Sequence, residues 1–208
     1  MSSPTLLVLA AGLGSRYGGI KQMDPVGPCG EFVLDYSIYD AWRAGFAEAV
    51  LVIREEHEEP LLQHFGTRLD GRIRVTYSCQ RLDDLPPGFA LPPGRQRPWG
   101  TGHAVWSARA AVRTSFGMIN ADDFYGAAAY GTLAEFLRGP RHDACTYAMV
   151  AYRLSNTLSR YGSVSRGICS RDAEGFLLEV IERTKIEMSE RGARYLGEDG
   201  AWGHLSGD

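Results

Sequence analysis

Short apolar runs alternate with amphipathic stretches along most of the chain. The apolar runs predict buried strands, and stretches with apolar side chains at every third or fourth position predict helices. The expected strands span 5–10, 49–53, 73–79, 115–121 and 145–154, and the expected helices span 35–44, 55–65, 102–112 and 127–137. This alternation indicates an α/β fold with a mostly parallel sheet.

The pattern changes beyond residue 154. Residues 161–184 hold two runs of strand-forming side chains around a turn at 172–175, which predicts an antiparallel pair. Residues 192–208 are rich in glycine and are expected to complete no element, so we interpret the chain as truncated at its C-terminus. Residues 82–98 contain five prolines and two glycines, which predicts a long loop, either a functional flap or a disordered segment.

Composition narrows the class of protein. The 208 residues carry a net charge of −3, with 44% hydrophobic and 23% charged residues, which is typical of a globular domain and gives no basic field for nucleic acid. The four cysteines stand apart, so we expect reduced thiols and no zinc site. Residues 1–11 are apolar without a basic leader and too short to span a bilayer. We therefore expect a cytoplasmic protein with no membrane partner.

A glycine-rich stretch, LAAGLGSRYGGIKQ at residues 9–22, follows the first expected strand. Main-chain N–H groups of residues 11–15 can line one concavity for phosphate oxygens, and Arg16 and Lys21 add positive charge. A dinucleotide fingerprint requires glycine where this chain has Tyr17, and a Walker loop requires Lys and a hydroxyl directly after its last glycine. A plain strand-to-helix turn explains the glycines but not the two cations. These alternatives stay open at this point.

Two acidic side chains follow a later strand. Asp122 and Asp123 come at the end of the strand expected at 115–121, the edge at which open α/β sheets bind ligands. Paired carboxylates suit Mg²⁺ that nucleotide phosphates also hold. The competing interpretation is that one of the two caps the helix that follows, and it is stronger for Asp123 than for Asp122.

Taken together, these stretches resemble the sugar-phosphate nucleotidyltransferase family. Residues 9–22 resemble its L-A-(A/G)-G-x-G-x-R…K loop, MINADDFYG at 118–126 its acidic motif, and CQRLDDLPPGFALPPGRQRPWGTGHAV at 79–105 its nucleobase region. SRYGSVSRG at 159–167 and EVIERTKIE at 179–187 resemble its sugar-contacting segments. The resemblance covers about residues 6–185 and implies a Rossmann-like three-layer α/β/α fold with a mostly parallel central sheet and a small antiparallel sugar-binding region.

The resemblance also implies roles for individual residues. Arg16, Lys21 and Asp122 would be catalytic, with Asp122 as a ligand of Mg²⁺. Thr101 is also expected to cap the helix after it, and His103 to be a packed or solvated helix residue. The implied nucleotide-binding residues are Leu9, Ala10, Ala11, Gly12, Gly14, Ser15, Gln80, Gly100, Thr101 and Gly102, and the implied sugar-binding residues are Gly162, Glu182 and Arg183.

The implied activity is transfer of a nucleotidyl group from an NTP, with UTP or dTTP favoured, to a sugar 1-phosphate, giving an NDP-sugar and pyrophosphate. Residues 1–208 would form one catalytic domain, with a nucleotide-binding half at 1–126 and the start of a sugar-binding half at 127–208. Assembly into a homo-oligomer stays open. Three alternatives stay open: a phosphocholine, isoprenoid or molybdopterin acceptor, nucleotide-sugar binding without turnover, and an oxidoreductase. The family's second metal carboxylate has no counterpart here, which fits a truncated chain.

Overall fold

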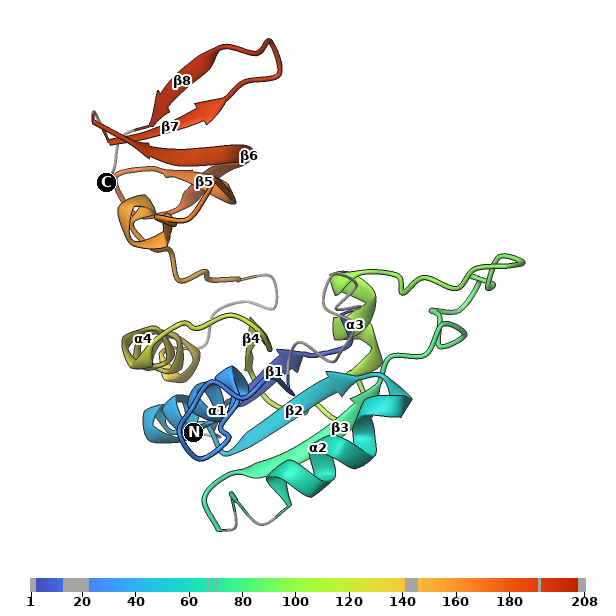
Figure 1. Ribbon diagram of the computed structural model, residues 1–208. Helices are drawn as coiled ribbons and strands as arrows, with labels where there is room; N and C mark the ends of the chain where they lie inside the picture. The colour runs from blue at the N-terminus through green and yellow to red at the C-terminus, as the bar shows by residue number, and fades with distance from the viewer. Residues whose placement is uncertain are drawn as a thin grey trace. The chain divides into compact units, whose positions relative to one another are not determined.

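The computed structural model of the protein describes residues 3–12, 23–66, 68–69, 71–140, 146–190 and 192–205. The chain divides into two compact units, Met1–Ala148 and Met149–Asp208. Among the described residues, the first unit holds a sheet of four parallel strands in the order β3-β2-β1-β4 (Figure 1). The strands are β1 (Thr5–Leu9), β2 (Glu48–Ile53), β3 (Arg74–Cys79) and β4 (Phe116–Asn120). The predicted parallel sheet is confirmed.

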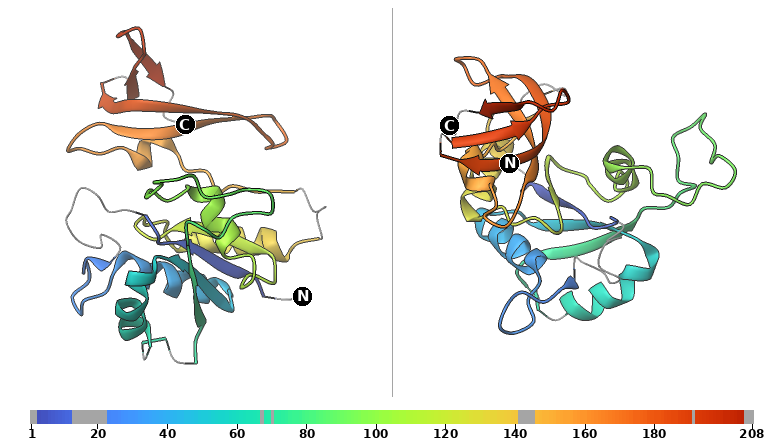
Figure 2. Two further views of the ribbon diagram at one scale, coloured as in Figure 1. Left: turned by 90° about the vertical axis from the view of Figure 1, so that its right-hand side faces the viewer. Right: turned by 45° about the horizontal axis from the view of Figure 1, so that its top comes forward.

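Helices cover both faces of this sheet (Figure 2). On one face pack α1 (Val33–Ala44), α2 (Glu58–Phe65), which follows the short helix η2 (Glu55–His57), and α4 (Ala127–Arg138). On the other face packs α3 (Thr101–Ser107), which ends earlier than the helix expected over 102–112. The described part of the first unit therefore has the expected three layers.

The central strand β1 is buried because its side chains alternate between the two layers. Leu6 and Val8 belong to the apolar cluster under α1, and Leu7 belongs to the cluster under α3. All three side chains are 0% exposed. A strand buried on both faces needs an unbroken apolar run, which is the pattern that the sequence shows here.

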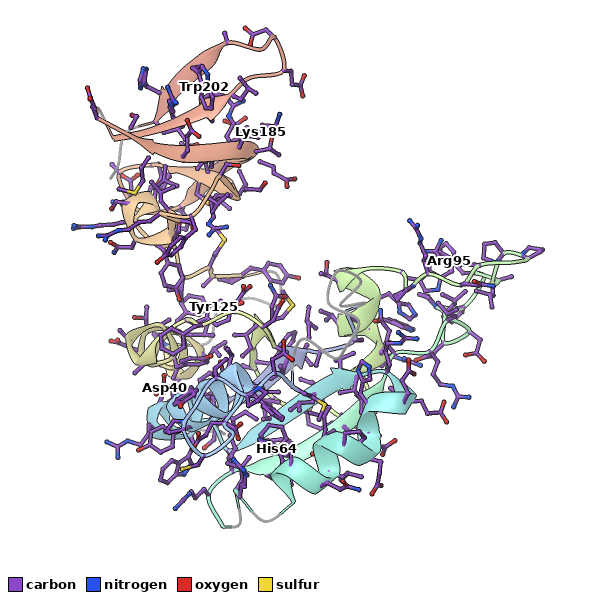
Figure 3. All side chains as sticks on the ribbon, viewed as in Figure 1. Asp40, His64, Arg95, Tyr125, Lys185 and Trp202 are labelled. Atoms are coloured by element: carbon purple, nitrogen blue, oxygen red, sulfur yellow. The ribbon has the colours of Figure 1, made fainter. Side chains whose placement is uncertain are left out.

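Side-chain contacts hold α1 at both ends. In its first turn, Asp35 accepts a hydrogen bond from the Phe32 N–H (2.6 Å) and contacts Nε2 of His64, in the last turn of α2, at 2.7 Å (Figure 3). At its other end, Gly45 adopts a φ of 92°, a left-handed conformation that favours glycine. Arg138 of α4 donates to the last carbonyl of α1 at 2.7 Å. The three helices of this layer are therefore joined through their ends.

Residues 82–98 contain no helix or strand, as predicted, and form a loop that extends away from the first sheet (Figure 1). Its base is closed by the Trp99 indole N–H, which donates to the Leu82 carbonyl at 3.0 Å. Arg109 pairs with both carboxylate oxygens of Asp84, at 2.6 and 2.7 Å. The guanidinium of Arg95 lies 3.6 Å from the centroid of the Trp99 ring. The loop is thus anchored where it leaves and rejoins the unit.

The second unit contains the antiparallel sheet that the sequence predicts in part. Its described strands pair in chain order, and Asp172 Oδ1 accepts a hydrogen bond from the Phe176 N–H (2.7 Å) in the expected turn between the first two. Ile186 and Ala193 are buried within this sheet. The elements are η3 (Leu154–Thr157), β5 (Val164–Arg171), β6 (Leu177–Ser189), β7 (Gly192–Leu196) and β8 (Trp202–Leu205).

Two expectations about the later part of the chain are wrong. Residues 192–205 complete a hairpin, β7–β8, whose turn is closed by the Gly197 N–H donating to the Ala201 carbonyl at 2.8 Å. The described part of the strand expected at 145–154 is not a strand, and Tyr147 and Met149 are exposed. An apolar run favours burial, but a strand also needs a partner whose free hydrogen-bonding edge lies beside it.

Removing the His64 ring should destabilise the first unit. Its side chain is 10% exposed, stacks on Phe32 at 3.8 Å and bonds Asp35. We expect His64→Ala to lower the free energy of unfolding by about 1–3 kcal/mol, measured by urea denaturation followed by circular dichroism. In the control Gln63→Ala, an exposed neighbour loses only its bond to Glu59. Equal losses in the two variants would contradict the role of His64.

Candidate functional site

The carboxyl ends of the parallel strands meet at one edge of the first sheet. There the Ala121 N–H, just after β4, donates to the Leu9 carbonyl of β1 at 3.1 Å, and the Gln80 N–H, just after β3, donates to the Ile53 carbonyl of β2 at 2.8 Å. The Gln80 side chain also reaches Gly100 at the start of α3. Along this edge therefore lie the candidate residues Leu9, Ala10, Ala11, Gly12, Gln80, Gly100, Thr101, Gly102 and Asp122.

The first residues of the glycine-rich stretch are anchored to the sheet. Ala10 and Ala11 are 2% and 4% exposed, and the Ala10 N–H donates to the Val52 carbonyl at 2.8 Å. The main chain is therefore still hydrogen-bonded to β2 at the residue that follows β1. The other candidates in this stretch lie outside the described residues: Gly14, Ser15, Arg16 and Lys21.

His57, from η2, supports this exit from β1. Its side chain is buried and is hydrogen-bonded to the Ala10 backbone. Burial lowers the pKa of His57, with a smaller contribution in the same direction from Arg54, while Glu56 and the Ala10 hydrogen bond oppose the shift. The neutral imidazole is thus favoured at the sheet edge.

The two acids after β4 have different surroundings. Asp123 Oδ2 accepts hydrogen bonds from Asn120 Nδ2 (2.9 Å) and from the Tyr125 hydroxyl (3.4 Å), whose oxygen accepts one from the Asn120 N–H (3.0 Å; Figure 3). The helix-cap interpretation of Asp123 is wrong, because Gly126 is the N-cap of α4 and no side chain bonds there. Asp122 is exposed and directly follows the main-chain bond that ties β4 to β1.

Gln80 belongs to a chain of hydrogen bonds that crosses the base of the long loop. Its Nε2 lies 3.3 Å from the Gly100 carbonyl oxygen and 3.0 Å from Nδ1 of His103. The other ring nitrogen of His103 lies 2.9 Å from the Asp84 carbonyl oxygen. The hydrogen bonds from Arg109 hold the pKa of Asp84 below its ordinary value. Gln80 is therefore held by the start of α3, and His103 links it to the loop.

The N-terminus of α3 presents main-chain atoms rather than a capping side chain. Gly100 is the N-cap with a φ of 122°, a conformation that L side chains rarely adopt. No side chain caps the helix, so the expected cap by Thr101 is wrong. Thr101 and Gly102 are exposed, and a Cβ built on Gly102 would meet nothing within 4 Å. A ligand can therefore approach the main chain here.

The sugar-side candidates all lie in the second unit. Gly162 precedes β5, and Glu182 lies on β6 opposite Gly167 of β5. Arg183, the next residue, lies 4.3 Å from the centroid of the Tyr195 ring. The β5–β6 register shifts between this pair and Ile186, where Lys185 (Figure 3) has a φ of 50°. A bulge of this kind turns a side chain away from the regular alternation.

Sequence reasoning missed three side chains that position the edge: His57, His103 and Tyr125. His57 and Tyr125 bond main chain at the end of a strand, and His103, which was expected to be a packed or solvated helix residue, bonds the Asp84 carbonyl in the loop. For His57 and Tyr125 the only sequence signal is a polar ring shortly after an expected strand. Among the described residues, no group of three or more His, Cys, Asp or Glu side chains is arranged to hold a metal ion. Nor is any described helix long and apolar enough to cross a membrane.

Comparison with protein families gives one match over most of the chain. The model of the family described as nucleotidyl transferase matches residues 6–183. The search of curated proteins gives no match.

Solved structures are similar to parts of this chain. A UTP-bound UGPase from Acinetobacter baumannii is 14% identical, with a TM-score of 0.50, over 86% of this chain and 67% of that one. A UDP-glucose pyrophosphorylase complexed with UDP-glucose is 18% identical, with a TM-score of 0.46, over 65% of this chain. The match spans about half of that pyrophosphorylase, 53% of its chain.

The burial of His57 predicts a loss of stability on mild acidification. Because its folded-state pKa is below the ordinary value of 6.5, the unfolded chain binds this proton first as the pH falls. The contribution of the neutral ring should be fully present above about pH 6.5 and should fade as the pH falls toward the folded-state pKa. Urea unfolding at about pH 7.5 and about pH 5.5 measures the loss. The variant His57→Asn cannot titrate at this position, so its free energy of unfolding should fall less between these two pH values. A pH dependence equal to that of the wild-type protein would refute the assignment.

Proposed function

The chain belongs to the nucleotidyl transferase family, and we propose that it transfers a nucleotidyl group from an NTP, UTP or dTTP, to a sugar 1-phosphate, giving an NDP-sugar and pyrophosphate. The observation that carries the proposal is the 3.1 Å hydrogen bond from Ala121 to Leu9. It sets Asp122 beside the start of the glycine-rich stretch at residues 9–22. A carboxylate beside a glycine-rich stretch suits a polyphosphate and its cation, because main-chain N–H groups can bind phosphate oxygens.

The proposed reaction needs positioning and charge neutralisation rather than a protein nucleophile. An anionic oxygen of the acceptor phosphate attacks the α-phosphorus of the NTP in line. The bond from the α-phosphorus to the bridging oxygen breaks, and pyrophosphate leaves with the electron pair. Because the attacking oxygen is already anionic, no side chain of the protein has to transfer a proton. Arg16 holds the departing β- and γ-phosphates, and Lys21 offsets charge at the α-phosphate.

The residues at the end of β4 fit Mg²⁺. This ion binds one or two carboxylates and takes its remaining ligands from phosphates and water. Asp122 is an exposed carboxylate at the sheet edge and directly follows the main-chain bond that ties β4 to β1. We therefore assign Asp122 as the protein ligand. When bound, Mg²⁺ would neutralise phosphate charge that builds up in the transition state.

We assign recognition of the acceptor to the second unit. Glu182 would accept hydrogen bonds from sugar hydroxyls, Arg183 would hold the phosphate, and the turn at Gly162 would lie against the sugar. The half-buried Arg183 side chain supports this assignment, because its guanidinium is held over the Tyr195 ring. It therefore loses less conformational entropy when it binds an anion.

Neutralising Asp122 should abolish most of the turnover. Asp122→Asn keeps the shape of the side chain and removes the charge, so we expect kcat to fall by about 10²–10³-fold with Mg²⁺, UTP or dTTP and a panel of sugar 1-phosphates. Pyrophosphate release measures the rate. The control Glu135→Gln removes one carboxylate from the exposed face of α4 and should leave the rate unchanged. Normal turnover by Asp122→Asn would refute the metal assignment.

Lys21 should contribute mainly to the transition state. We expect Lys21→Ala to lower kcat by about 10²–10³-fold, equivalent to about 3–4 kcal/mol, with a smaller change in the Kd for the nucleotide. Lys21→Arg keeps the charge and should recover part of the rate. Pyrophosphate release and calorimetric titration of the nucleotide separate the two effects. A Lys21→Ala variant with near-normal turnover would show that the assigned role is wrong.

A further inference from the structure

We infer that His103 is a positioning residue that fixes the amide of Gln80 in one orientation and so selects the nucleobase. The inference deepens the proposed function and rests on it, since Gln80 must face the base. Gln80 is half-buried, and the two contacts at its Nε2 position come from the start of α3, one from the carbonyl of the N-cap Gly100 and one from the His103 ring. Those contacts determine which amide atom is the donor.

The direction of each hydrogen bond follows from the Asp84 carbonyl. A carbonyl oxygen only accepts, so the ring nitrogen of His103 that lies 2.9 Å from it must carry the proton. In the neutral ring the other nitrogen, Nδ1, is then an acceptor. The Gly100 carbonyl is the second acceptor, 3.3 Å from the same amide atom of Gln80. With acceptors on both sides, that atom must be the NH₂ group.

The carbonyl of the Gln80 amide is therefore left for the ligand. Among the residues that the structure describes, Oε1 of Gln80 makes no hydrogen bond. An amide carbonyl facing a base favours a ring N–H at the pairing edge. Uracil and thymine present such an N–H at N3, whereas cytosine presents a lone pair there, as adenine does at N1. The inference is that the site prefers a base with an imide edge and rejects cytosine.

His103 also links this choice to the loop at 82–98. Its ring lies 6.3 Å from the Trp99 ring, and Trp99 itself bonds the Leu82 carbonyl. Without the imidazole, the Gln80 NH₂ keeps only the longer contact to Gly100. The amide could then rotate by half a turn and offer an N–H to the lone pair of cytosine.

The test is a calorimetric comparison of UTP and CTP binding to the full chain. These nucleotides differ only at the pairing edge of the base. We expect the wild-type protein to bind UTP at least about tenfold more tightly than CTP. His103→Phe keeps a ring beside Trp99 and removes both polar contacts, so the ratio should fall below about threefold, with CTP gaining relative to UTP. Gln80→Met has no amide and should also lose the preference for UTP over CTP. This variant provides the test if His103→Phe does not fold.

Arg109→Met is the matched control. It removes the ion pair with the Asp84 side chain at the same loop base but leaves the Asp84 carbonyl that bonds His103. Its UTP-to-CTP ratio should stay within about twofold of the wild-type value. An unchanged ratio in His103→Phe, or equal wild-type affinities for UTP and CTP, would overturn the inference and leave the proposed function standing. A wild-type protein that binds neither nucleotide would overturn both.

Discussion

The hydrogen-bond ladders on both sides of β1 are the constraint on which the rest of the first unit depends. β1 pairs in parallel with β2 and with β4, and its central side chains are fully buried because helices cover both faces. Parallel pairing in matched register makes the carboxyl ends of neighbouring strands finish together. Residues that follow strands far apart in the sequence therefore lie along one edge, with Asp122 next to Ala10–Gly12. The nucleotide site that we propose is a consequence of that register.

Side chains around this edge bond mainly to main-chain atoms. His57 bonds Ala10, Tyr125 bonds Asn120, and His103 bonds Asp84, so main-chain groups that have left the ladders still find partners. A buried polar group without a partner would cost about 1–3 kcal/mol. These contacts also order the segments that would meet a nucleotide. Under the proposed function, less conformational entropy is then lost on binding.

The elements of the first unit could be predicted because a parallel sheet between two helical layers requires unbroken apolar runs. The run at 49–53 is β2 except for its first residue. The same signal failed at 145–154, where apolar side chains specified no partner strand. The β7–β8 hairpin was missed for the opposite reason. Its turn is rich in glycine and resembles unstructured chain, although Gly197 and Ala201 close it with a hydrogen bond. Local composition therefore predicts which residues are buried better than it predicts which strands pair.

The sheet edge that carries the described candidate residues could be predicted from the sequence, but the contacts that orient their side chains could not. The sequence favours Asp122 over Asp123 as the metal ligand by its position nearer the strand end, but it does not reveal that Asn120 and Tyr125 hydrogen-bond Asp123. His103 has the position of an ordinary helix residue until the loop at 82–98 brings Asp84 to one of its ring nitrogens and Gln80 to the other. Composition predicted that this loop is either a functional flap or a disordered segment. Its anchored base supplies the carbonyl that sets the His103 tautomer, so the loop is connected to the candidate site through fixed hydrogen bonds.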